Sequence, residues 1–455
     1  MDRANVRARA TAGVVAAGLL LAAGTAPAPP ASAESAFTAE MVAASSDYSI
    51  LGEAVADGDG DLYFPGDTSY GAAAWLYRYD KASDTAGPAE PYAPVADVHG
   101  LVVRGSLVFF IGTDTGTSVR SVYAYDPAAG TASAWGGGAS IEPAGNSTLA
   151  FLGDALFYIG ADGDVHRLDA DDPAVDAVRV DAACSDSSAP SGADDLVTAG
   201  SAVYFTAECA IGGEFPRDPF VIPDPGGDAI DFDQPAFNPD GYDLGYATGF
   251  LDDGADGLFF SAGEDSALRQ LYRMTGAGLV QVDPSHPNPA NPFRWNGSVH
   301  WFTGSGGTLG LARFETDGTV SRLPLVRGEL QDPLRATPWG DLLLLNGFFT
   351  VTGTPDAGNF VYDPATGVVT RLAGITAAWA QPVVDDAYVF GDVDGVAGNR
   401  IFRVEAAAAP EPGPDPLLPA TGAGTEASWA LGVLLLATGA AALLLRRRAR
   451  ATPRA

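Results

Sequence analysis

One hydrophobic pattern recurs along the chain and accounts for most of its 455 residues. Each copy is a run of large apolar residues, such as Leu107-Val108-Phe109-Phe110-Ile111, followed by a variable loop and a mixed run that often ends in an acid. Successive copies lie 41 to 55 residues apart, a period typical of the blades of a β-propeller. The eight copies are centred on residues 62–64, 108–110, 156–158, 203–205, 258–260, 299–301, 342–344 and 388–390.

Each repeat predicts four strands. The first is mixed, as at residues 100–104, and a tight glycine turn connects it to the fully apolar second strand. The third strand alternates in part, as at residues 165–169, and the fourth is short, as at residues 131–135. Because a blade packs against a neighbour on each side, its central strands are buried on both faces and cannot alternate with polar residues. The pattern therefore favours stacked blades over a sandwich with one wet face.

The two ends of the repeat region complement each other. The eighth repeat ends near Glu405 without a fourth strand, and residues 37–43 form a spare strand-like segment before the first repeat begins near Ser49. We predict that this segment completes the last blade and closes the ring, which removes exposed sheet edges. The predicted fold is all-β, a propeller of eight four-stranded blades over residues 34–406, with a seven-bladed ring as the alternative.

Two short motifs resemble known propeller repeats. Phe314-Glu315-Thr316-Asp317-Gly318-Thr319 resembles the end of the ELWxxDGT repeat, although the Glu-Leu-Trp opening is absent. Tyr125-Asp126-Pro127 resembles a kelch strand without the kelch double glycine. These resemblances imply a propeller and no particular activity.

Residues 1–33 have the features of an export signal. Three arginines precede an apolar run from Ala12 to Ala23, and Ala31-Ser32-Ala33 has the small-x-small form that signal peptidase accepts. The run is short for a membrane-spanning helix. We therefore expect secretion, with cleavage after Ala33.

The C-terminal region has three parts in a fixed order. A Pro-rich spacer, residues 407–417, leads to Leu418-Pro419-Ala420-Thr421-Gly422, and an apolar run, residues 427–445, precedes a basic tail, residues 446–455. At 1.5 Å per residue the apolar run reaches about 28 Å as a helix, which suffices to cross a hydrocarbon core. This order resembles the LPxTG cell-wall sorting signal of Gram-positive surface proteins.

That resemblance implies a sortase as a partner. The enzyme cleaves between Thr421 and Gly422 and joins the Thr421 carbonyl to an amine of the peptidoglycan precursor. The chain is then a secreted cell-wall protein, held in the membrane only transiently by the helix at residues 427–445. A permanent single-pass anchor is the alternative.

Composition restricts the partners. The chain has 57 Asp and Glu against 25 Lys and Arg, a net charge of −32. Such a surface repels phosphate backbones, so nucleic acid is not expected as a partner. The charge favours solubility, and we expect a monomer. Cation binding is the second explanation of the charge.

Cys184 and Cys209 are the only two cysteines. Cys184 follows the third repeat and Cys209 follows the second strand of the fourth, so adjacent blades can bring them together. An even pair in an exported chain predicts a disulfide. Two free buried thiols are the alternative.

Asp57, Asp59 and Asp61 alternate with glycines at the spacing that opens an EF-hand calcium loop. The acid expected at the twelfth position is absent, since Thr68 stands there, and Asp-Gly is also common hairpin chemistry. The sequence leaves two interpretations open: these carboxylates bind calcium, or the segment is a hairpin turn without a metal. No other cofactor is predicted.

No catalytic motif stands out. The chain has no GxSxG elbow, no phosphate-binding glycine loop, and no pair of histidines at metal spacing. The loops between second and third strands are long and varied, and diversity on a rigid scaffold is where binding usually resides. We predict a surface-displayed binding or adhesion module for an extracellular glycan or protein, with the ligand on this loop face.

The alternative function is a wall-tethered hydrolase with acids in the central channel. Two or more acids that converge with a basic side chain would favour it. The first-strand residues expected near the axis are Glu53, Arg104, Arg294, Arg335 and Gln381.

The sorting signal generates the first testable prediction. Muramidase digestion of the cell wall should release a protein whose C-terminal residue is Thr421, linked to a peptidoglycan fragment. Mass spectrometry of the C-terminal peptide measures this directly. Surface protein that still carries Arg450 would contradict it.

Overall fold

A computed structural model describes the residues of the repeat region with interruptions in its loops. The described residues are 37–42, 48–68, 74–89, 95–137, 141–184, 190–209, 217–242, 244–253, 257–263, 269–275, 278–283, 290–303, 310–323, 329–351, 354–372, 375, 379–383, 386–393 and 396–406. The chain divides into two compact units, Met1–Ala406 and Ala407–Ala455. Within the described ranges, no helix is long and apolar enough to cross a membrane.

The predictions for both chain ends fall outside the described residues. They comprise the signal segment 1–33 with Ala33, the spacer 407–417, the sorting motif from Leu418 to Gly422, the apolar run 427–445 and the tail 446–455.

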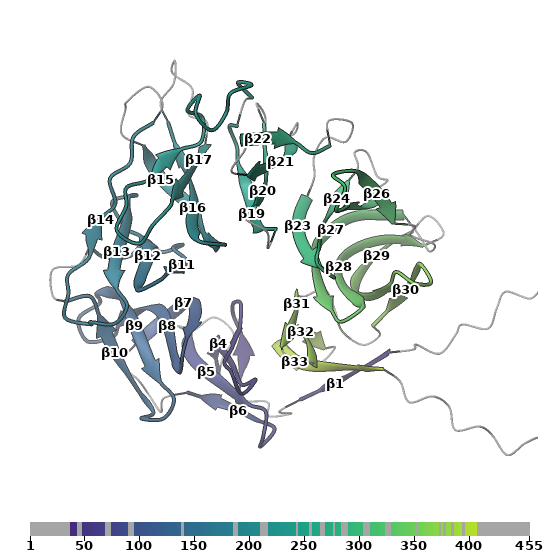
Figure 1. Ribbon diagram of the computed structural model, residues 1–455. Coiled ribbons are helices and arrows are strands. Elements are labelled where there is room, and N and C mark those ends of the chain that lie inside the picture. The colour runs from purple at the N-terminus through teal and green to yellow at the C-terminus, as the bar shows by residue number, and fades with distance from the viewer. Residues whose placement is uncertain are drawn as a thin grey trace, which may run out of the picture. The chain divides into compact units, whose positions relative to one another are not determined.

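The described residues form eight four-stranded antiparallel blades, as the repeat period predicts (Figure 1). Blades 1 to 4 comprise, in order, β2 (Ser49–Ile50) with β3 (Val55–Ala56), β4 (Leu62–Asp67), β5 (Trp75–Asp80) and β6 (Thr85–Pro88); β7 (Val95–Arg104), β8 (Leu107–Asp114), β9 (Arg120–Asp126) and β10 (Thr131–Trp135); β11 (Leu149–Leu152), β12 (Ala155–Ile159), β13 (Val165–Asp169) and β14 (Val178–Arg179); and β15 (Ser191–Ala199), β16 (Ala202–Glu208), β17 (Arg217–Ile222) and β18 (Ile230–Asp231).

Blades 5 to 8 follow the same order. They comprise β19 (Thr248–Asp252), β20 (Leu258–Ala262), β21 (Gln270–Thr275) and β22 (Gly278–Gln281); β23 (Ala290–Trp295), β24 (Ser298–Thr303), β25 (Gly310–Phe314) and β26 (Val320–Leu323); β27 (Glu329–Trp339), β28 (Leu342–Val351), β29 (Thr354–Asp363) and β30 (Val368–Arg371); and β31 (Trp379–Val383), β32 (Asp386–Val393) and β33 (Val396–Ala406) with β1 (Phe37–Met41).

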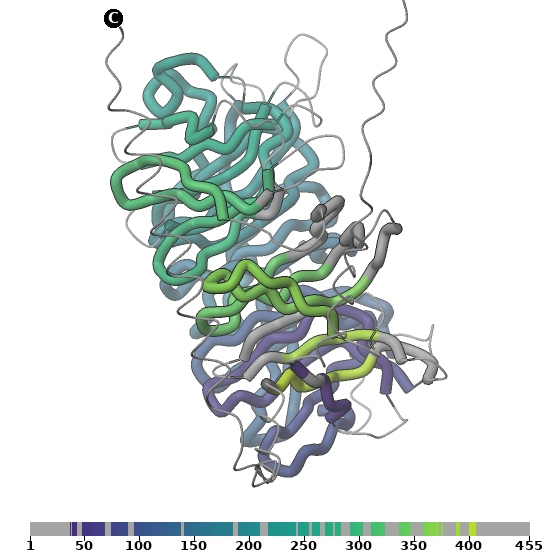
Figure 2. Tube along the Cα trace, turned by 90° about the vertical axis from the view of Figure 1, so that its right-hand side faces the viewer, coloured from purple at the N-terminus to yellow at the C-terminus, as the bar shows by residue number. Residues whose placement is uncertain are grey.

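The N-terminal strand completes the last blade, as predicted. β1 pairs antiparallel with β33 from Phe37 opposite Ala406 to Met41 opposite Phe402, so the two lie side by side (Figures 1 and 2). A further pair, Ile50 with Asn399, joins β2 to β33, so blades 8 and 1 form one continuous sheet of nine strands. The first strand and the last blade thus hold the ring closed by hydrogen bonds.

The second strand of the blades is the most deeply buried. Every residue of β4, β12 and β20 is buried, whereas the third strand β5 alternates in part. Tyr63, Phe157 and Phe259 have no exposed surface at all. This burial on both faces explains why the second strands show no polar alternation in the sequence.

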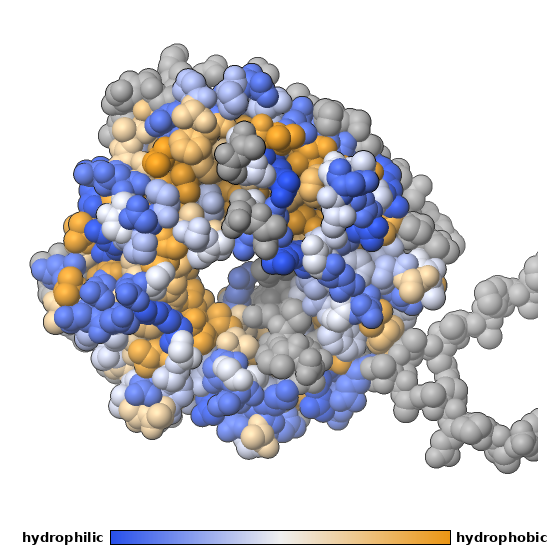
Figure 3. Space-filling model, viewed as in Figure 1, coloured by the Kyte–Doolittle hydropathy of each residue, from blue (hydrophilic) through white to orange (hydrophobic). Residues whose placement is uncertain are grey.

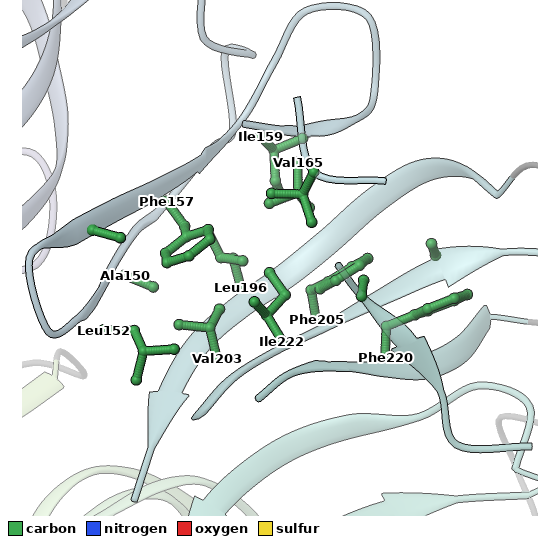
Figure 4. Close-up of a cluster of buried hydrophobic side chains, with 14 of the residues drawn as sticks. Ala150, Leu152, Phe157, Ile159, Val165, Leu196, Val203, Phe205, Phe220 and Ile222 are labelled. Carbon is green, nitrogen blue, oxygen red and sulfur yellow. The ribbon is translucent and has the colours of Figure 1, made fainter. Parts of the chain in front are cut away.

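The core is a circle of separate clusters, one between each pair of neighbouring blades. The eight clusters of the described residues span the interfaces 1/2, 2/3, 3/4, 4/5, 5/6, 6/7, 7/8 and 8/1. At the interface of blades 3 and 4, Phe157 from β12 faces Val203 and Leu196 from the next blade (Figure 4). The core therefore depends on every blade having two neighbours.

A disulfide links Cys184 and Cys209 across the interface of blades 3 and 4, with the two Cα atoms 5.8 Å apart. Cys184 follows β14, and Cys209 follows β16. Both residues are buried and belong to the cluster between these blades. The covalent bond therefore adds to the side-chain packing and to the hydrogen bonds between the two blades, such as the one from the Ala229 backbone N–H to the Asp181 carbonyl at 2.8 Å.

The closure of the ring generates the second prediction. Phe37 packs its ring edge-on against Trp339, with 6.0 Å between ring centroids, while Glu40 on the same strand is exposed. Phe37→Ser should lower the free energy of unfolding by about 2 kcal/mol, because it removes a partly buried aromatic group from the closing strand. Urea denaturation of residues 34–421 measures this. Glu40→Ser is the matched control, and equal effects of the two changes would contradict the closing role of β1.

Candidate functional site

A pocket of about 550 Å³ lies between blades 4 and 5, a volume that suits a small ligand or a large side chain. It opens on the face of the tight turns. Gly200 and Ser201 form the turn between β15 and β16, and Gly257 belongs to the turn between β19 and β20. In the space-filling view, apolar atoms gather over these two blades beside the opening at the centre (Figure 3).

Three aromatic rings, of which Phe232 contacts the other two, form one wall of this pocket. Tyr204 on β16 lies 5.9 Å from Phe232, and Phe232 lies 5.7 Å from Phe237, measured between ring centroids. Phe232 is buried, while Tyr204 and Phe237 are half-buried. The remaining apolar wall comes from Val221, Ile230, Leu258 and Met274.

The described lining includes one carboxylate and no basic side chain. Asp252 ends β19 and lies against the turn of the neighbouring blade, with its Oδ1 atom 3.8 Å from the position that a β-carbon on Gly200 would occupy. Burial raises the pKa of the Tyr204 phenol, and the charge of Asp252 raises it further. The Tyr204 hydroxyl is therefore a neutral hydrogen-bond donor beside a carboxylate at neutral pH.

The pocket owes its shape to the longest connection between second strands. The step from Leu258 back to Val203 is 55 residues, and the extra length lies between β18 and β19. Asn238 braces this connection, since its Nδ2 donates to Asp233 and to the Tyr242 carbonyl while its Oδ1 accepts from the Tyr242 backbone. Phe237 is thus held at the blade interface by its buried neighbour.

A second polar group lies on β15, the innermost strand of blade 4. Arg217 Nη1 donates to Asp194 Oδ2 at 2.9 Å, and its Nη2 lies 3.6 Å from Glu208 Oε1. Thr248, from blade 5, donates to Asp195 Oδ2 at 3.2 Å. Three acids, one arginine and one hydroxyl therefore meet where two blades adjoin.

Asp195 adopts a backbone conformation that favours glycine, with φ at +53°. Asp194 pairs with Thr206 on the central strand, as His99 pairs with Ile111 in blade 2 and Thr248 with Ser261 in blade 5. The residues that follow His99 and Thr248 are Gly100 and Gly249, with φ at +61° and +69°. Asp195 thus stands where two other blades use glycine.

The electrostatics of Asp195 also differ from those of a plain surface acid. Desolvation by the surrounding wall raises the pKa of Asp195, and the charge of Asp194 raises it further. The hydrogen bond from Thr248 and the charges of Arg217 and Arg269 oppose this rise. Asp195 thus combines an exposed position with a raised carboxyl pKa, a combination that suits a general acid or a ligand contact.

The residues considered for calcium form a hairpin turn. Asp57 Oδ1 accepts the backbone N–H groups of Asp59 and Asp61, both at 3.0 Å. The carboxylate of Asp61 accepts from Arg78 Nε at 2.9 Å and from the backbone of Lys81. These contacts are those expected of the hairpin alternative, and calcium at Asp57, Asp59 and Asp61 stays a prediction.

Among the described residues, one group of three ligand-type atoms lies within 4.8 Å of one another, and it does not include Asp57, Asp59 or Asp61. It consists of Cys209, Asp218 and Asp231, all buried. Because the sulfur of Cys209 belongs to the disulfide, it is not a thiolate and does not offer the donor that a metal needs.

The described histidines are built into the blades. His300 is buried and stacks on Phe293, with its Nδ1 3.2 Å from the Ser298 carbonyl, and burial lowers its pKa to about 4. His166 Nε2 contacts both carboxylate oxygens of Asp162, at 3.0 and 3.1 Å. Each of these two histidines is thus held by contacts within its own blade.

The residues expected near the axis have separate environments. Arg104 forms ion pairs with Asp154 and Asp171, both at 3.0 Å, while Glu53 and Arg294 are exposed. Arg335 and Gln381 lie on β27 and β31, and their side chains are outside the described residues. Asp194 and Asp195 were not predicted as site residues, and their one signal in the sequence is a pair of consecutive acids in a first strand.

The predicted loop face is described only in part. Residues 210–216, 264–268 and 304–309, each between the second and third strands of a blade, are outside the described residues. The ligand on that face stays a prediction, while the pocket described here lies on the opposite face.

No protein-family model and no curated protein matches the chain. Among solved structures, a prolyl endopeptidase is similar over 77% of this chain and 54% of its own, with 16% identity and a TM-score of 0.49. The β-propeller domain of the Trilobed protease from Pyrococcus furiosus is similar over 72% of this chain and 96% of its own, with 10% identity and a TM-score of 0.43. Oligogalacturonate lyase from Vibrio parahaemolyticus is similar over 79% and 98%, with 11% identity and a TM-score of 0.45. The chain spans about half the length of the endopeptidase and of a puromycin hydrolase, at 54% and 51%.

Asp195 generates the third prediction. Asp195→Gly should raise the free energy of unfolding at pH 7 by about 0.5–1 kcal/mol, because glycine adopts positive φ without strain. Asp195→Asn keeps the strain and removes only the charge. Since the folded-state pKa is raised, ionisation of Asp195 destabilises the fold above the ordinary aspartate pKa. The gain from Asp195→Asn should therefore shrink as pH falls toward 4.

Urea denaturation between pH 4 and pH 8 measures both changes. Asp194→Gly is the control, since it removes the partner of Arg217 and should destabilise the protein. Destabilisation by Asp195→Gly would show that the residue is there for stability instead of function.

Proposed function

We propose that this chain is a binding module displayed on the cell wall, and that it receives an apolar group of an extracellular ligand in the pocket between blades 4 and 5. The observation that carries the proposal is the pocket itself, a ligand-sized hollow with an aromatic wall and few polar groups. Such a composition is typical of sites that hold a ligand by burial and orient it with one or two hydrogen bonds.

The side chains that line the pocket favour a binding function over a catalytic one. Its polar groups are the carboxylate of Asp252, the phenol of Tyr204 and the hydroxyls of Ser201 and Thr275. A carboxylate and a phenol can hold and orient a ligand, but no activated nucleophile adjoins them among the described lining residues.

The proposed location rests on the sequence. An export signal ending at Ala33, a Pro-rich spacer and the tripartite signal around Thr421 form the arrangement of a wall-attached protein. The spacer would carry the propeller away from its point of attachment, where extracellular ligands can reach it. Sortase and peptidoglycan are accordingly the proposed partners of the C-terminal segment.

A hydrolase is the second candidate function, and the acids of β15 favour it. Asp195, whose pKa is raised, stands beside Asp194, which pairs with Arg217. Two carboxyl groups in unlike environments are the usual arrangement for general acid and base chemistry. Hydrolase activity at the acids of β15 would be lost in Asp195→Asn and retained in variants of the pocket lining.

The fourth prediction separates the two functions. The protein of residues 34–421 is screened against glycans and proteins. The ligand that is found should bind at least ten-fold more weakly to the variant Phe237→Ala, which removes one ring of the aromatic wall. Val280→Ala, an exposed residue on β22 of the same blade, is the matched control. Glycosidase and esterase activity that Asp195→Asn abolishes would replace the binding function with the hydrolase.

A further inference from the structure

We infer that the pocket between blades 4 and 5 selects a positively charged amine carried on an apolar body, such as an alkylated ammonium group. The inference rests on the proposed function and names the chemical class of its ligand. Aromatic rings, a carboxylate and the lack of described basic residues in the lining point to the same class.

The aromatic wall supplies the first argument. Tyr204, Phe232 and Phe237 are linked by centroid distances of 5.9 and 5.7 Å, and two of the three rings are partly exposed to the pocket. The face of an aromatic ring carries negative electrostatic potential, and it attracts a cation within about 6 Å. Alkylated ammonium groups suit such walls because their methyl groups also bury apolar surface.

The position of Asp252 supplies the second argument. Its carboxylate is next to the turn at Gly200, it lines the same pocket as Tyr204, and its charge raises the pKa of the Tyr204 phenol. A carboxylate beside aromatic rings stabilises a cation and disfavours an anion, because like charges repel strongly where water is partly excluded. The pocket is therefore expected to reject carboxylate and phosphate ligands.

The surrounding charge supplies the third argument. The described lining contains no lysine, arginine or histidine, and the whole chain carries a net charge of −32. A negative surface raises the local concentration of cations and speeds their encounter with a pocket. The negative surface thus favours cationic ligands over anionic ones before they reach the pocket.

The other polar residues of the lining fit an amine with hydrogens as well as a quaternary one. Ser201 and Thr275, which both carry hydroxyls, line the pocket together with Asp252. The volume of about 550 Å³ exceeds that of a lone ammonium group, so it leaves space for an attached aliphatic or aromatic body along Leu258 and Met274. These apolar residues would bury the body of the ligand while the rings and Asp252 bind its charged end.

The test compares a cation with its uncharged isostere. Isothermal titration calorimetry of the processed chain should show that benzyltrimethylammonium binds at least ten-fold more tightly than neopentylbenzene, which has the same shape without the charge. Benzoate should not bind. The preference should weaken as salt concentration rises, because part of the attraction is electrostatic.

Variants locate the interaction. Asp252→Asn should weaken benzyltrimethylammonium binding at least ten-fold and leave neopentylbenzene unchanged, whereas Phe237→Leu should weaken both. Asp228→Asn is the matched control: it removes the same charge from the exposed segment between β17 and β18 and does not line the pocket. Thermal denaturation of each variant establishes that it is folded.

The outcomes distinguish this inference from the proposed function. Equal binding of cation and isostere, both weakened by Phe237→Leu, would overturn the preference for an amine and leave a binding pocket. If Asp252→Asn and Asp228→Asn weaken cation binding equally, the preference for cations comes from the general negative charge of the surface, and the inference about the pocket is wrong. The inference would also fail if neither probe bound; the proposed function would fail with it only if the broad ligand screen gave no binder sensitive to Phe237→Ala.

Discussion

The requirement that every blade bury both of its faces governs this structure. The eight apolar clusters of the described residues occupy the eight interfaces between neighbouring blades. A blade with one free face would expose a sheet of aromatic side chains such as Phe109 and Phe157, at a cost of about 2–3 kcal/mol for each large side chain. The chain meets this requirement only when its ends meet, which is why β1 pairs with β33 instead of extending blade 1.

The candidate pocket lies at an interface where two neighbouring blades pack together incompletely. The long connection between β18 and β19 adds Phe237 and Leu244 to the cluster between blades 4 and 5, next to Phe232 just after the end of β18. These residues fill the interface only in part, and a hollow remains at the end nearest the tight turns. Insertions of this kind change the surface without changing the fold, because each blade still has a neighbour on both sides.

Two acids in turns between strands have closer charged partners than the acids on the inner strand β15. In blades 1 and 5, Arg78 and Arg273 from the third strand donate to Asp61 and Asp253 in the turn before the second strand, which fixes the turn and satisfies a buried acid. The acids of β15 are arranged less favourably, since Asp195 combines positive φ with partial loss of hydration. Such local costs persist where the residue has another role, and they mark β15 as the place to look for chemistry.

The sequence alone predicted the all-β class, a ring of eight blades with seven as the alternative, and the closing strand at residues 37–43, because burial on both faces leaves unbroken apolar runs. The structure decided for eight blades. The sequence also brought Cys184 and Cys209 to adjacent blades, since strand order along the chain equals blade order around the ring. The pocket could not be derived in this way. Its wall joins Tyr204, Phe237 and Asp252, which the tertiary structure brings together across two blades and an irregular connection. The unusual state of Asp195 likewise depends on Thr248 and Arg217, which the periodic pattern does not connect with it. Periodicity encodes the regular packing of strands, whereas a site depends on departures from that regularity, and only the folded chain decides which of those departures meet.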